Sequence, residues 1–367
     1  FAAMGPRRIF AAAPGTFTYG VPELSFGVLS DVHICLAKGG RRLKGGYDTT
    51  HLEKAFAWFR DNGADAVVIA GDMAHSGLVG ELKAVADAYG NSPSMVATSY
   101  GNELGKCNFA ALDKWMVAHK RYDPRRITMC STARTVAPSD DFMVTHCYPG
   151  LGMTRGKLDG STDFDYEDVY GKAPIPVIAH EIGQWPVYPI WDDLLQPFTG
   201  TMRPWNLSRH RDTAAKKNAL RFQREYHAAS AKLNRLIYKE EVESFLRTPS
   251  CAGLQLLNVQ DYTGQAEALV GWRGPLSDLK RGFVDLPPFA TVWGPISYLA
   301  RFPKFTYVVG ETFRAELQIR NLTAETLRAG TALKWSFAGR EETLGLPSDV
   351  EPGKVATVAT VEIPLTE

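Results

Sequence analysis

Short apolar runs recur along the chain from about residue 24 to about residue 260, and several are separated by segments with helical spacing. The runs are rich in Val, Ile and Leu, as in strands that are buried on both faces of a parallel sheet. They predict seven strands, at residues 24–30, 66–71, 95–101, 127–131, 142–146, 175–180 and 253–259. Amphipathic helices are predicted at 49–64, 80–90 and 110–123, with a longer helical stretch, broken once, from 212 to 246.

Alternating strands and helices predict an α/β fold with parallel strands, of the (β/α) TIM-barrel-like kind. A complete barrel needs eight strands, so the seven seen here predict a barrel that is incomplete or hybrid. After about residue 304 apolar and polar residues alternate with period two. This change predicts a small antiparallel β-sandwich at the end of the chain.

The charge balance and the cysteines narrow the possible classes of protein. With 41 basic and 40 acidic residues, the net charge of +1 gives no reason to expect binding to nucleic acid or to an anionic membrane. No apolar run approaches the roughly 18 to 20 residues of a membrane span. The five cysteines form no CxxC pair and are expected to be free thiols. The N-terminal "MGPRRIFAAAP" is similar to the end of an export signal, which predicts a periplasmic or secreted protein.

Three polar residues at the ends of the first two predicted strands form one candidate site. Asp31 and His33 lie in "SDVHI", and Asp72 lies in "VVIAGDMAH". Carboxylate and imidazole groups at neighbouring strand ends are suited to a divalent metal such as Mn, Fe or Zn. Residues 22–88 resemble the N-terminal part of calcineurin-like metallophosphoesterases, whose first motifs read DxH and GDxxD. The resemblance implies metal-dependent phosphoester hydrolysis.

This segment departs from the phosphoesterase pattern in three places. The last Asp of the second motif is His75, the Asn102 of a GNH-like motif is followed by Glu103, and no GHxH pair occurs. Two interpretations therefore stay open: a metal site, or polar strand-end residues that no longer hold two metals.

A pair of glutamates forms the second candidate site. Glu103 follows strand 95–101 in "SYGNELG", and Glu181 follows strand 175–180 in "IPVIAHE". The carboxyl ends of parallel barrel strands lie on one face, where active sites are built. Glycoside hydrolysis needs two carboxyl groups, an acid and a nucleophile, about 5 to 5.5 Å apart in retaining enzymes. Polar and aromatic neighbours are candidate sugar contacts, namely Asn102, His146, Tyr148, His180 and Trp185.

Several segments in the same order resemble the catalytic half of family 2 glycoside hydrolases, in a β-galactosidase-like branch. They are "SPSMVATSYGNELG", "THCYPG", "PVIAHEIGQWPVYP", "AKLNRLIYKEEVESFLRTP" and "GLQLLNVQDYTGQAEALVG". The resemblance runs from about residue 87 to the end, and it implies that Glu103 is the acid/base and Glu181 the nucleophile. It also implies a carbohydrate substrate and no cofactor.

The two resemblances meet near residues 80–92, which predicts four parts of the chain. These are an N-terminal extension (1–21), a phosphoesterase-like segment (22–88), a glycoside-hydrolase barrel half (89–303) and an immunoglobulin-like sandwich (304–367). The junction fits a natural fusion, a misassembled reading frame or a chimera. Three functions follow as alternatives: a retaining glycosidase, a metal-dependent phosphoesterase, and an inactive or carbohydrate-binding relic.

Overall fold

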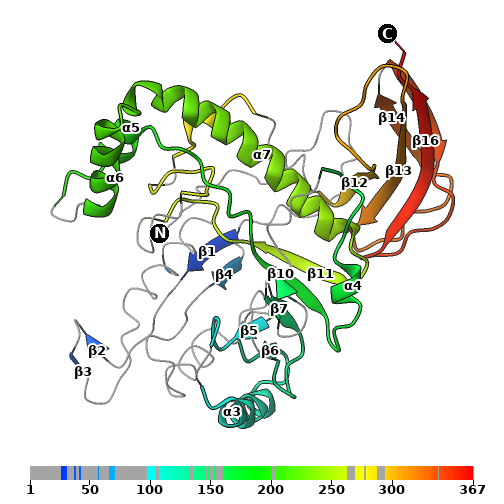
Figure 1. The fold of residues 1–367 in the computed structure, drawn as a ribbon. Helices are drawn as coiled ribbons and strands as arrows, with labels where there is room; N and C mark the ends of the chain where they lie inside the picture. Colours follow the sequence, from blue (N-terminus) through cyan, green and yellow to red (C-terminus); the bar gives the residue numbers. More distant parts are fainter. Residues whose placement is uncertain are drawn as a thin grey trace. The chain divides into compact units, whose positions relative to one another are not determined.

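The computed structural model describes most of the chain beyond residue 97 and short strands before it (Figure 1). The described residues are 26–30, 37–38, 41–42, 57, 66–70, 97–104, 107–131, 136–145, 147–148, 152–153, 160–200, 204–262, 269–276, 278–286, 294–337 and 339–366. The chain divides into two compact units, Phe1–Val144 and Thr145–Glu367, and each is described by itself.

The first unit contains two pairs of parallel strands. Strand β1 (Phe26–Ser30) pairs in parallel with β4 (Ala66–Ala70). Strand β5 (Ala97–Ser99) pairs in parallel with β6 (Ile127–Met129), and helix α3 (Phe109–Tyr122) connects them. Short strands β2 (Ala37–Lys38) and β3 (Arg41–Arg42) form an antiparallel pair, and β7 (Met143–Thr145) spans the boundary between the two units.

Helix α3 has clear start and stop signals in the sequence. The Asn108 side chain accepts a hydrogen bond from the backbone N–H of Ala111 (3.1 Å), which is the usual N-cap arrangement. Basic residues occupy the last turn, where they interact favourably with the helix dipole, and the helix ends before Asp123-Pro124. Its buried Met116 packs against Cys130 and fixes the helix on the parallel strand pair.

The second unit begins with a β/α arrangement built around one long helix. Strands β10 (Val177–Ile182) and β11 (Cys251–Leu256) are parallel neighbours. Between them the chain forms α5 (Trp191–Leu195), α6 (Trp205–Lys216), a 3-10 turn η1 (Leu220–Phe222) and α7 (Gln223–Arg247). Shorter elements complete this part: β8 (Cys147–Tyr148), β9 (Gly152–Met153), α4 (Glu167–Tyr170) and the 3-10 turn η2 (Arg281–Phe283).

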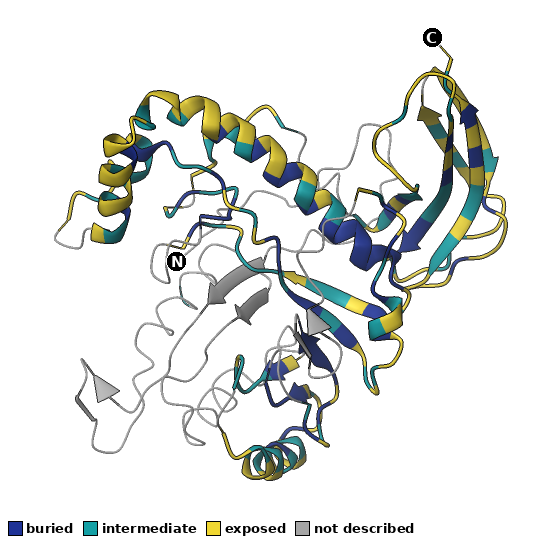
Figure 2. Cartoon of the chain, in the orientation of Figure 1, coloured by how far each residue is buried: buried dark blue, intermediate teal, exposed yellow. Residues whose placement is uncertain are grey.

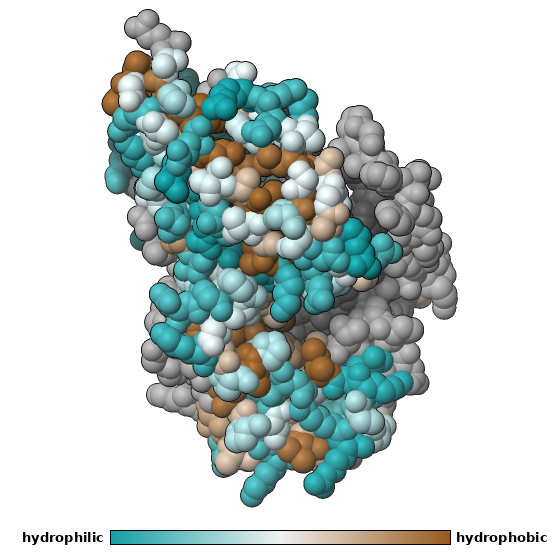
Figure 3. All heavy atoms as spheres, turned by 90° about the vertical axis from the view of Figure 1, so that its right-hand side faces the viewer, coloured by the Kyte–Doolittle hydropathy of each residue, from teal (hydrophilic) through white to brown (hydrophobic). Residues whose placement is uncertain are grey.

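A small antiparallel sandwich follows in the same unit. Strands β12 (Ile296–Arg301), β13 (Thr312–Asn321) and β16 (Val355–Pro364) form one sheet, and β14 (Ala332–Phe337) and β15 (Arg340–Gly345) form the other. The apolar core between them includes Phe313, Ala315, Val361 and Ile363. The face drawn in Figure 3 is mostly hydrophilic, with apolar side chains gathered in a few areas.

Buried arginines connect the sandwich to the C-terminal end of α7. Arg320 of β13 donates to the carbonyl oxygens of Thr248 (3.0 Å) and Cys251 (2.8 Å). Arg247, at the end of α7, donates to the carbonyl oxygen of Phe164 (3.1 Å) and is paired with Glu240 (2.6 Å). Figure 2 shows α7 buried at this end and exposed along much of its first half. The long helix therefore bridges the sandwich and the region of the candidate site.

The structure confirms several of the element predictions. Each of the seven predicted strands corresponds to an observed strand, the predicted helix 110–123 is α3, and the expected break in the stretch 212–246 falls between α6 and α7. The helical stretch begins earlier than predicted, at Trp205, and β12 lies before the predicted sandwich boundary at 304. The helices predicted at 49–64 and 80–90 lie outside the described residues, apart from Ala57. The barrel and the four-part organisation stay predictions.

Candidate active site

Glu181 lies at a β-bulge in strand β10. The pairing with β11 advances by three residues on β10, from Ala179 to Ile182, but by only two on β11. Such an extra residue shifts the alternation of side chains between the two faces of a strand. His180 and Ile182 are accordingly buried, as are Val177 and Ala179 before the bulge, whereas Glu181 is partly exposed. The bulge turns the Glu181 side chain out of the buried face.

The backbone of Glu181 is held in a left-handed conformation, with φ of +51°. Among the described residues, the non-glycine residues with positive φ are Glu103, Glu181 and Asn218. Asn218 directly follows helix α6, where an asparagine in this conformation is common. Glutamate has no such preference, and strained backbone of this kind costs about 1 to 3 kcal/mol and gathers at functional sites. The two glutamates chosen from the sequence thus share an unusual backbone conformation.

Two polar side chains flank the carboxylate of Glu181. The Nε2 atom of His180, which is buried, lies 4.0 Å from Glu181 Oε1. The side-chain amide of Gln184 donates to Glu181 Oε2 (3.4 Å) and to the Glu181 carbonyl oxygen (3.3 Å). The structure therefore brings His180 next to Glu181 and adds Gln184, which the sequence analysis did not single out.

The segment that follows Glu181, residues 183–191, is bound along one side of helix α7. Side chains of α7 make hydrogen bonds to its backbone at successive turns, from Gln223 at one end to Glu241 at the other. The contacts are Trp191 N–H to Gln223 Oε1 (2.9 Å), His227 Nδ1–H to Tyr188 O (2.7 Å), Tyr188 N–H to Ser230 Oγ (2.9 Å), Asn234 Nδ2–H to Trp185 O (2.5 Å) and Gly183 N–H to Glu241 Oε2 (2.8 Å).

Trp185 is fixed at both ends by this helix. Its carbonyl oxygen accepts from Asn234, and its indole Nε1–H donates to Glu241 Oε2 at 3.0 Å. The residue as a whole stays partly exposed. A partly exposed indole in a fixed orientation is suited to stacking on a sugar ring. The structure thus places Trp185 four residues beyond Glu181 in a defined orientation.

Gly183 allows the chain to pass close to α7. Its φ is +82°, and a Cβ atom there would lie 1.9 Å from a ring carbon of Tyr238. Burial, with Glu241 nearby, raises the pKa of the Tyr238 hydroxyl, so this ring stays neutral. Only glycine fits both the left-handed backbone and the space left by the ring.

His227 is held as a neutral imidazole. Its Nε2 accepts from the backbone N–H of Gly282 (3.0 Å), so its proton is on Nδ1, which faces the carbonyl oxygen of Tyr188. Burial lowers the pKa of His227, and the nearby Lys280 and Arg281 add to this effect. The histidine therefore has a structural role in joining the 183–191 segment to η2.

A cavity of about 260 Å³ lies beside this segment, lined among others by Pro189, Ile190 and His227. Its lining includes Asp261 and Lys280, which form a buried ion pair at 2.7 Å. Asp261 also accepts the N–H of Gly271 (3.1 Å). Burial raises the pKa of Asp261 to about 6 and lowers the pKa of Lys280. Asp261 is thus buried and fixes a turn after β11.

Glu103 and Asn102 belong to the first unit, directly after strand β5. The strand ends where Tyr100 N–H donates to the Met129 carbonyl oxygen (3.2 Å), and the N–H of Leu104 donates to Ser131 Oγ (3.0 Å). Between these two anchors Glu103 adopts φ of +51° and is partly exposed, while Asn102 is exposed. A strained turn at the carboxyl end of a parallel strand presents these two side chains.

The remaining predicted site residues lie outside what the structure describes. Asp31, His33 and Asp72 are among the undescribed residues, as is His146, and only the strand backbone is described for Tyr148. Within the described residues, no three His, Cys, Asp or Glu side chains are grouped so that they could hold a metal ion. The phosphoesterase site therefore stays a prediction from the sequence.

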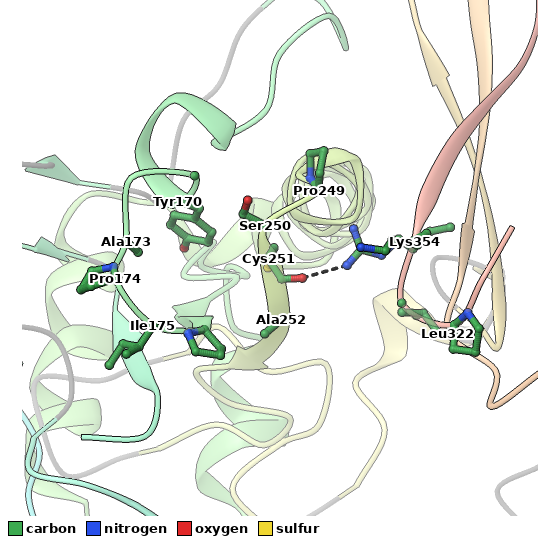
Figure 4. A pocket seen from close by; sticks show the side chains of 15 residues that line it. Tyr170, Ala173, Pro174, Ile175, Pro249, Ser250, Cys251, Ala252, Leu322 and Lys354 are labelled. Carbon is green, nitrogen blue, oxygen red and sulfur yellow. Dashed lines mark hydrogen bonds between the residues drawn. The ribbon is translucent and has the colours of Figure 1, made fainter. Parts of the chain in front are cut away.

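A larger pocket, of about 560 Å³, lies at the opposite end of β10 and β11 (Figure 4). It is lined by residues that precede the two strands, such as Pro174 and Ser250, and by Lys354 of the sandwich. The dashed line in Figure 4 is the hydrogen bond to the Cys251 carbonyl oxygen, which Arg320 donates. Parallel-sheet enzymes build their sites at the carboxyl ends of strands, so this pocket is not the candidate active site.

The residues that the sequence analysis missed are the polar side chains of α7. The sequence analysis did not single out Asn234 or Glu241, yet both are buried. Their spacing with Ala231 and Tyr238 places all four on one helical face, and this spacing was the available signal. No described helix is long and apolar enough to cross a membrane.

Comparison with known proteins adds no family. No protein-family model matches the chain, and no curated protein matches its sequence.

Proposed function

We propose that the chain is a retaining glycoside hydrolase of the β-galactosidase-like kind, acting on the O-glycosidic bonds of a carbohydrate. Glu181 is the nucleophile and Glu103 the general acid/base. The observation that supports this most is the strained left-handed backbone that both glutamates share. Glu181 has further support from its bulge, from His180 and from the ordered segment that carries Trp185.

The proposed mechanism follows from the chemistry of the two carboxyl groups. The Glu181 carboxylate attacks the anomeric carbon while Glu103 protonates the departing glycosidic oxygen, which forms a covalent glycosyl–enzyme intermediate. Glu103 then removes a proton from a water molecule, which displaces Glu181 and restores the original anomeric configuration. Asn102 is proposed to bind the sugar 2-hydroxyl, and Trp185 to stack on the ring. The reaction requires no metal or organic cofactor.

The test compares hydrolysis of an aryl β-galactoside by the parent protein, Glu181→Ala, Glu103→Ala and a control, Glu362→Ala. Glu362 is an exposed carboxylate of the sandwich, so its loss removes a charge without touching the proposed site. We expect both site variants to lose at least about 10²-fold in turnover, which is the lower range for general acid–base catalysis. The control should keep the parent activity.

Azide then separates the two roles. With Glu181→Ala, azide enters from the face that the carboxylate has left and gives the inverted glycosyl azide. With Glu103→Ala, azide attacks the glycosyl–enzyme intermediate and gives the retained glycosyl azide. Full activity in both alanine variants would contradict the proposal, and sugar binding without turnover by the parent protein would favour a carbohydrate-binding relic.

A further inference from the structure

The surface formed by α6, η1 and the first turns of α7 is strongly basic. Between residues 204 and 232 there are seven Lys and Arg against two Asp and Glu, a local net charge of +5 in a chain whose total is +1. Figure 1 shows these elements at the end of α7 that is farther from the sandwich, and Figure 2 shows them largely exposed. The near-neutral total therefore conceals a concentrated patch, which we call the basic face.

Most charges of the basic face are not neutralised by their surroundings. The two carboxylates of α5 are already engaged, Asp192 with Arg211 (3.3 Å) and Asp193 with Arg281 (2.6 Å). Within the described part of the chain, no ion pair forms with the other basic side chains of the face, which are Arg209, Lys216, Lys217, Arg221, Arg224 and Lys232. The face thus keeps its positive potential.

Large aromatic side chains are exposed among these charges. Trp205 is 71% exposed, Tyr226 44% and Phe222 39%. The guanidinium of Arg221 lies 4.5 Å above the centre of the Phe222 ring. An aromatic surface interspersed with cations offers stacking for rings and charge for anions, which is unusual for a solvated helical face.

Trp205 and two of the basic residues share one side of α6. At about 100° per residue, Trp205, Arg209 and Lys216 lie opposite the buried Leu207 and Ala214. The buried side of α6 packs on Trp191, the first residue of α5 and the end of the segment that starts after Glu181. The basic face is therefore built on the same ordered segment that carries Trp185.

We propose that the basic face binds an anionic polysaccharide, one that carries sulfate or carboxylate groups, and that such a polymer is the substrate class of the enzyme. The basic side chains contact the charged groups, and Trp205, Phe222 and Tyr226 stack on sugar rings. This inference rests on the proposed glycosidase function, because the segment after Glu181 leads directly to this face. In this proposal one polymer lies along the basic face and has its scissile glycosidic bond at Glu181.

The aromatic rings favour a polysaccharide over a lipid surface, since rigid rings flanked by arginines match pyranose rings with anionic substituents. Nucleic acid would satisfy the same charges, so it is made an outcome of the test. In every case the electrostatic part of the affinity must weaken with salt, because the Debye length falls from about 10 Å at 0.1 M to shorter distances at higher salt.

The experiment titrates the full-length Glu181→Gln protein, in which a polymer is not cut, with dextran sulfate and polygalacturonate. Uncharged dextran, a single-stranded oligonucleotide and phosphatidylserine vesicles are the comparison ligands. The test variant adds Lys216→Gln, Lys217→Gln and Arg221→Gln. The matched control instead adds Arg314→Gln, Arg328→Gln and Lys334→Gln, three exposed cations of the sandwich.

We expect at least one anionic polysaccharide to bind, with affinity that falls about tenfold or more as salt rises from about 50 to about 250 mM. The test variant should bind the polysaccharide about tenfold more weakly than the Glu181→Gln protein. The affinity of the control variant should stay within twofold of that protein. Absence of binding, equal or tighter binding of the oligonucleotide or the vesicles, or no effect of the test variant would each overturn the inference.

Hydrolysis of the aryl β-galactoside by the parent protein, purified in parallel with the Glu181→Gln protein, keeps the two proposals distinguishable. Turnover of the small substrate without polymer binding refutes only the proposal that the basic face binds a polysaccharide, and it leaves the glycosidase function standing. Selective polymer binding through the face without any turnover refutes the glycosidase function and keeps the face as a polysaccharide-binding surface.

Discussion

Replacing Glu241 tests how the segment after Glu181 is held. One oxygen of this buried carboxylate, Oε2, accepts both the Gly183 N–H (2.8 Å) and the Trp185 indole N–H (3.0 Å). Glu241→Leu removes this acceptor, so the N–H groups of Gly183 and Trp185 lose their common hydrogen-bond partner. A buried donor such as the Gly183 N–H costs about 1 to 3 kcal/mol when it loses its partner, and the partly buried Trp185 indole costs less, so the local stability should fall by about 2 to 4 kcal/mol.

Glu241→Gln is the matched control for this change. Its amide oxygen has the size and position to accept both hydrogen bonds, so the two N–H donors stay paired. We expect a loss of about 1 kcal/mol, because bonds to a neutral oxygen are weaker than bonds to a carboxylate. The difference in local stability between the leucine and glutamine variants separates the loss of the hydrogen-bond acceptor from the loss of the negative charge.

Hydrogen exchange measured by mass spectrometry on the peptide covering residues 183–191 is the assay. A loss of 2 kcal/mol corresponds to an increase of about thirtyfold in the exchange rate for local opening. The leucine variant should reach at least this increase and the glutamine variant only a few-fold, while the peptide of β13 keeps its parent rate. Parent-like exchange of 183–191 in Glu241→Leu would show that the α7 contacts do not order this segment.

Gly183→Ala forces a Cβ against the Tyr238 ring at a left-handed position, so it should destabilise the fold by about 2 to 4 kcal/mol, measured by denaturant unfolding. Because burial raises the pKa of Asp261 to about 6, its carboxyl group binds a proton more readily in the folded state, and its share of the unfolding free energy decreases as pH rises from about 4 to about 6. Asp261→Asn should remove this dependence when both proteins are unfolded across that range, and parallel curves would contradict the raised pKa of Asp261. The pKa of His227 is lowered, so the stability it contributes is present above about 6.5 and is lost as pH falls further, which exchange of residues 183–191 at pH 5 and 7 measures. His227→Gln, which keeps one donor and one acceptor, should lose that pH dependence.

The strands were predictable because their residues follow a simple rule. Runs such as "AVVIA" and "MVATS" are apolar, β-branched and of strand length, and each corresponds to an observed strand. The start of α3 at Asn108 and its end before Pro124 also follow from local capping chemistry. These features depend on neighbouring residues alone.

The geometry at Glu181 could not be predicted in the same way. The bulge arises from how β10 pairs with β11, a strand that is about 70 residues later in the chain, and no local pattern in "IPVIAHE" encodes that register. The left-handed φ is likewise a tertiary effect, since glutamate has no local preference for it. Sequence reasoning found the residue and its chemical type, while the fold determines its orientation.

The polar side of α7 shows a further limit of local patterns. Asn234 and Glu241 are hydrophilic, and a helix of this composition is usually interpreted as solvent-facing at such positions. Their burial depends on a backbone segment that needs hydrogen-bond partners, and this need is visible only in three dimensions.

The pairing of β12 with β13 determines where this chain can be divided. A cut at the predicted boundary of 303/304 would separate Ile296–Arg301 from the six residues Glu316–Asn321 with which it pairs. Both strands would then present open edges, which invite pairing with other molecules. The same cut would remove Arg320 from the carbonyl oxygens of Thr248 and Cys251. Protein engineers who trim or exchange modules here should therefore move the sandwich together with α7 and with strands β10 and β11.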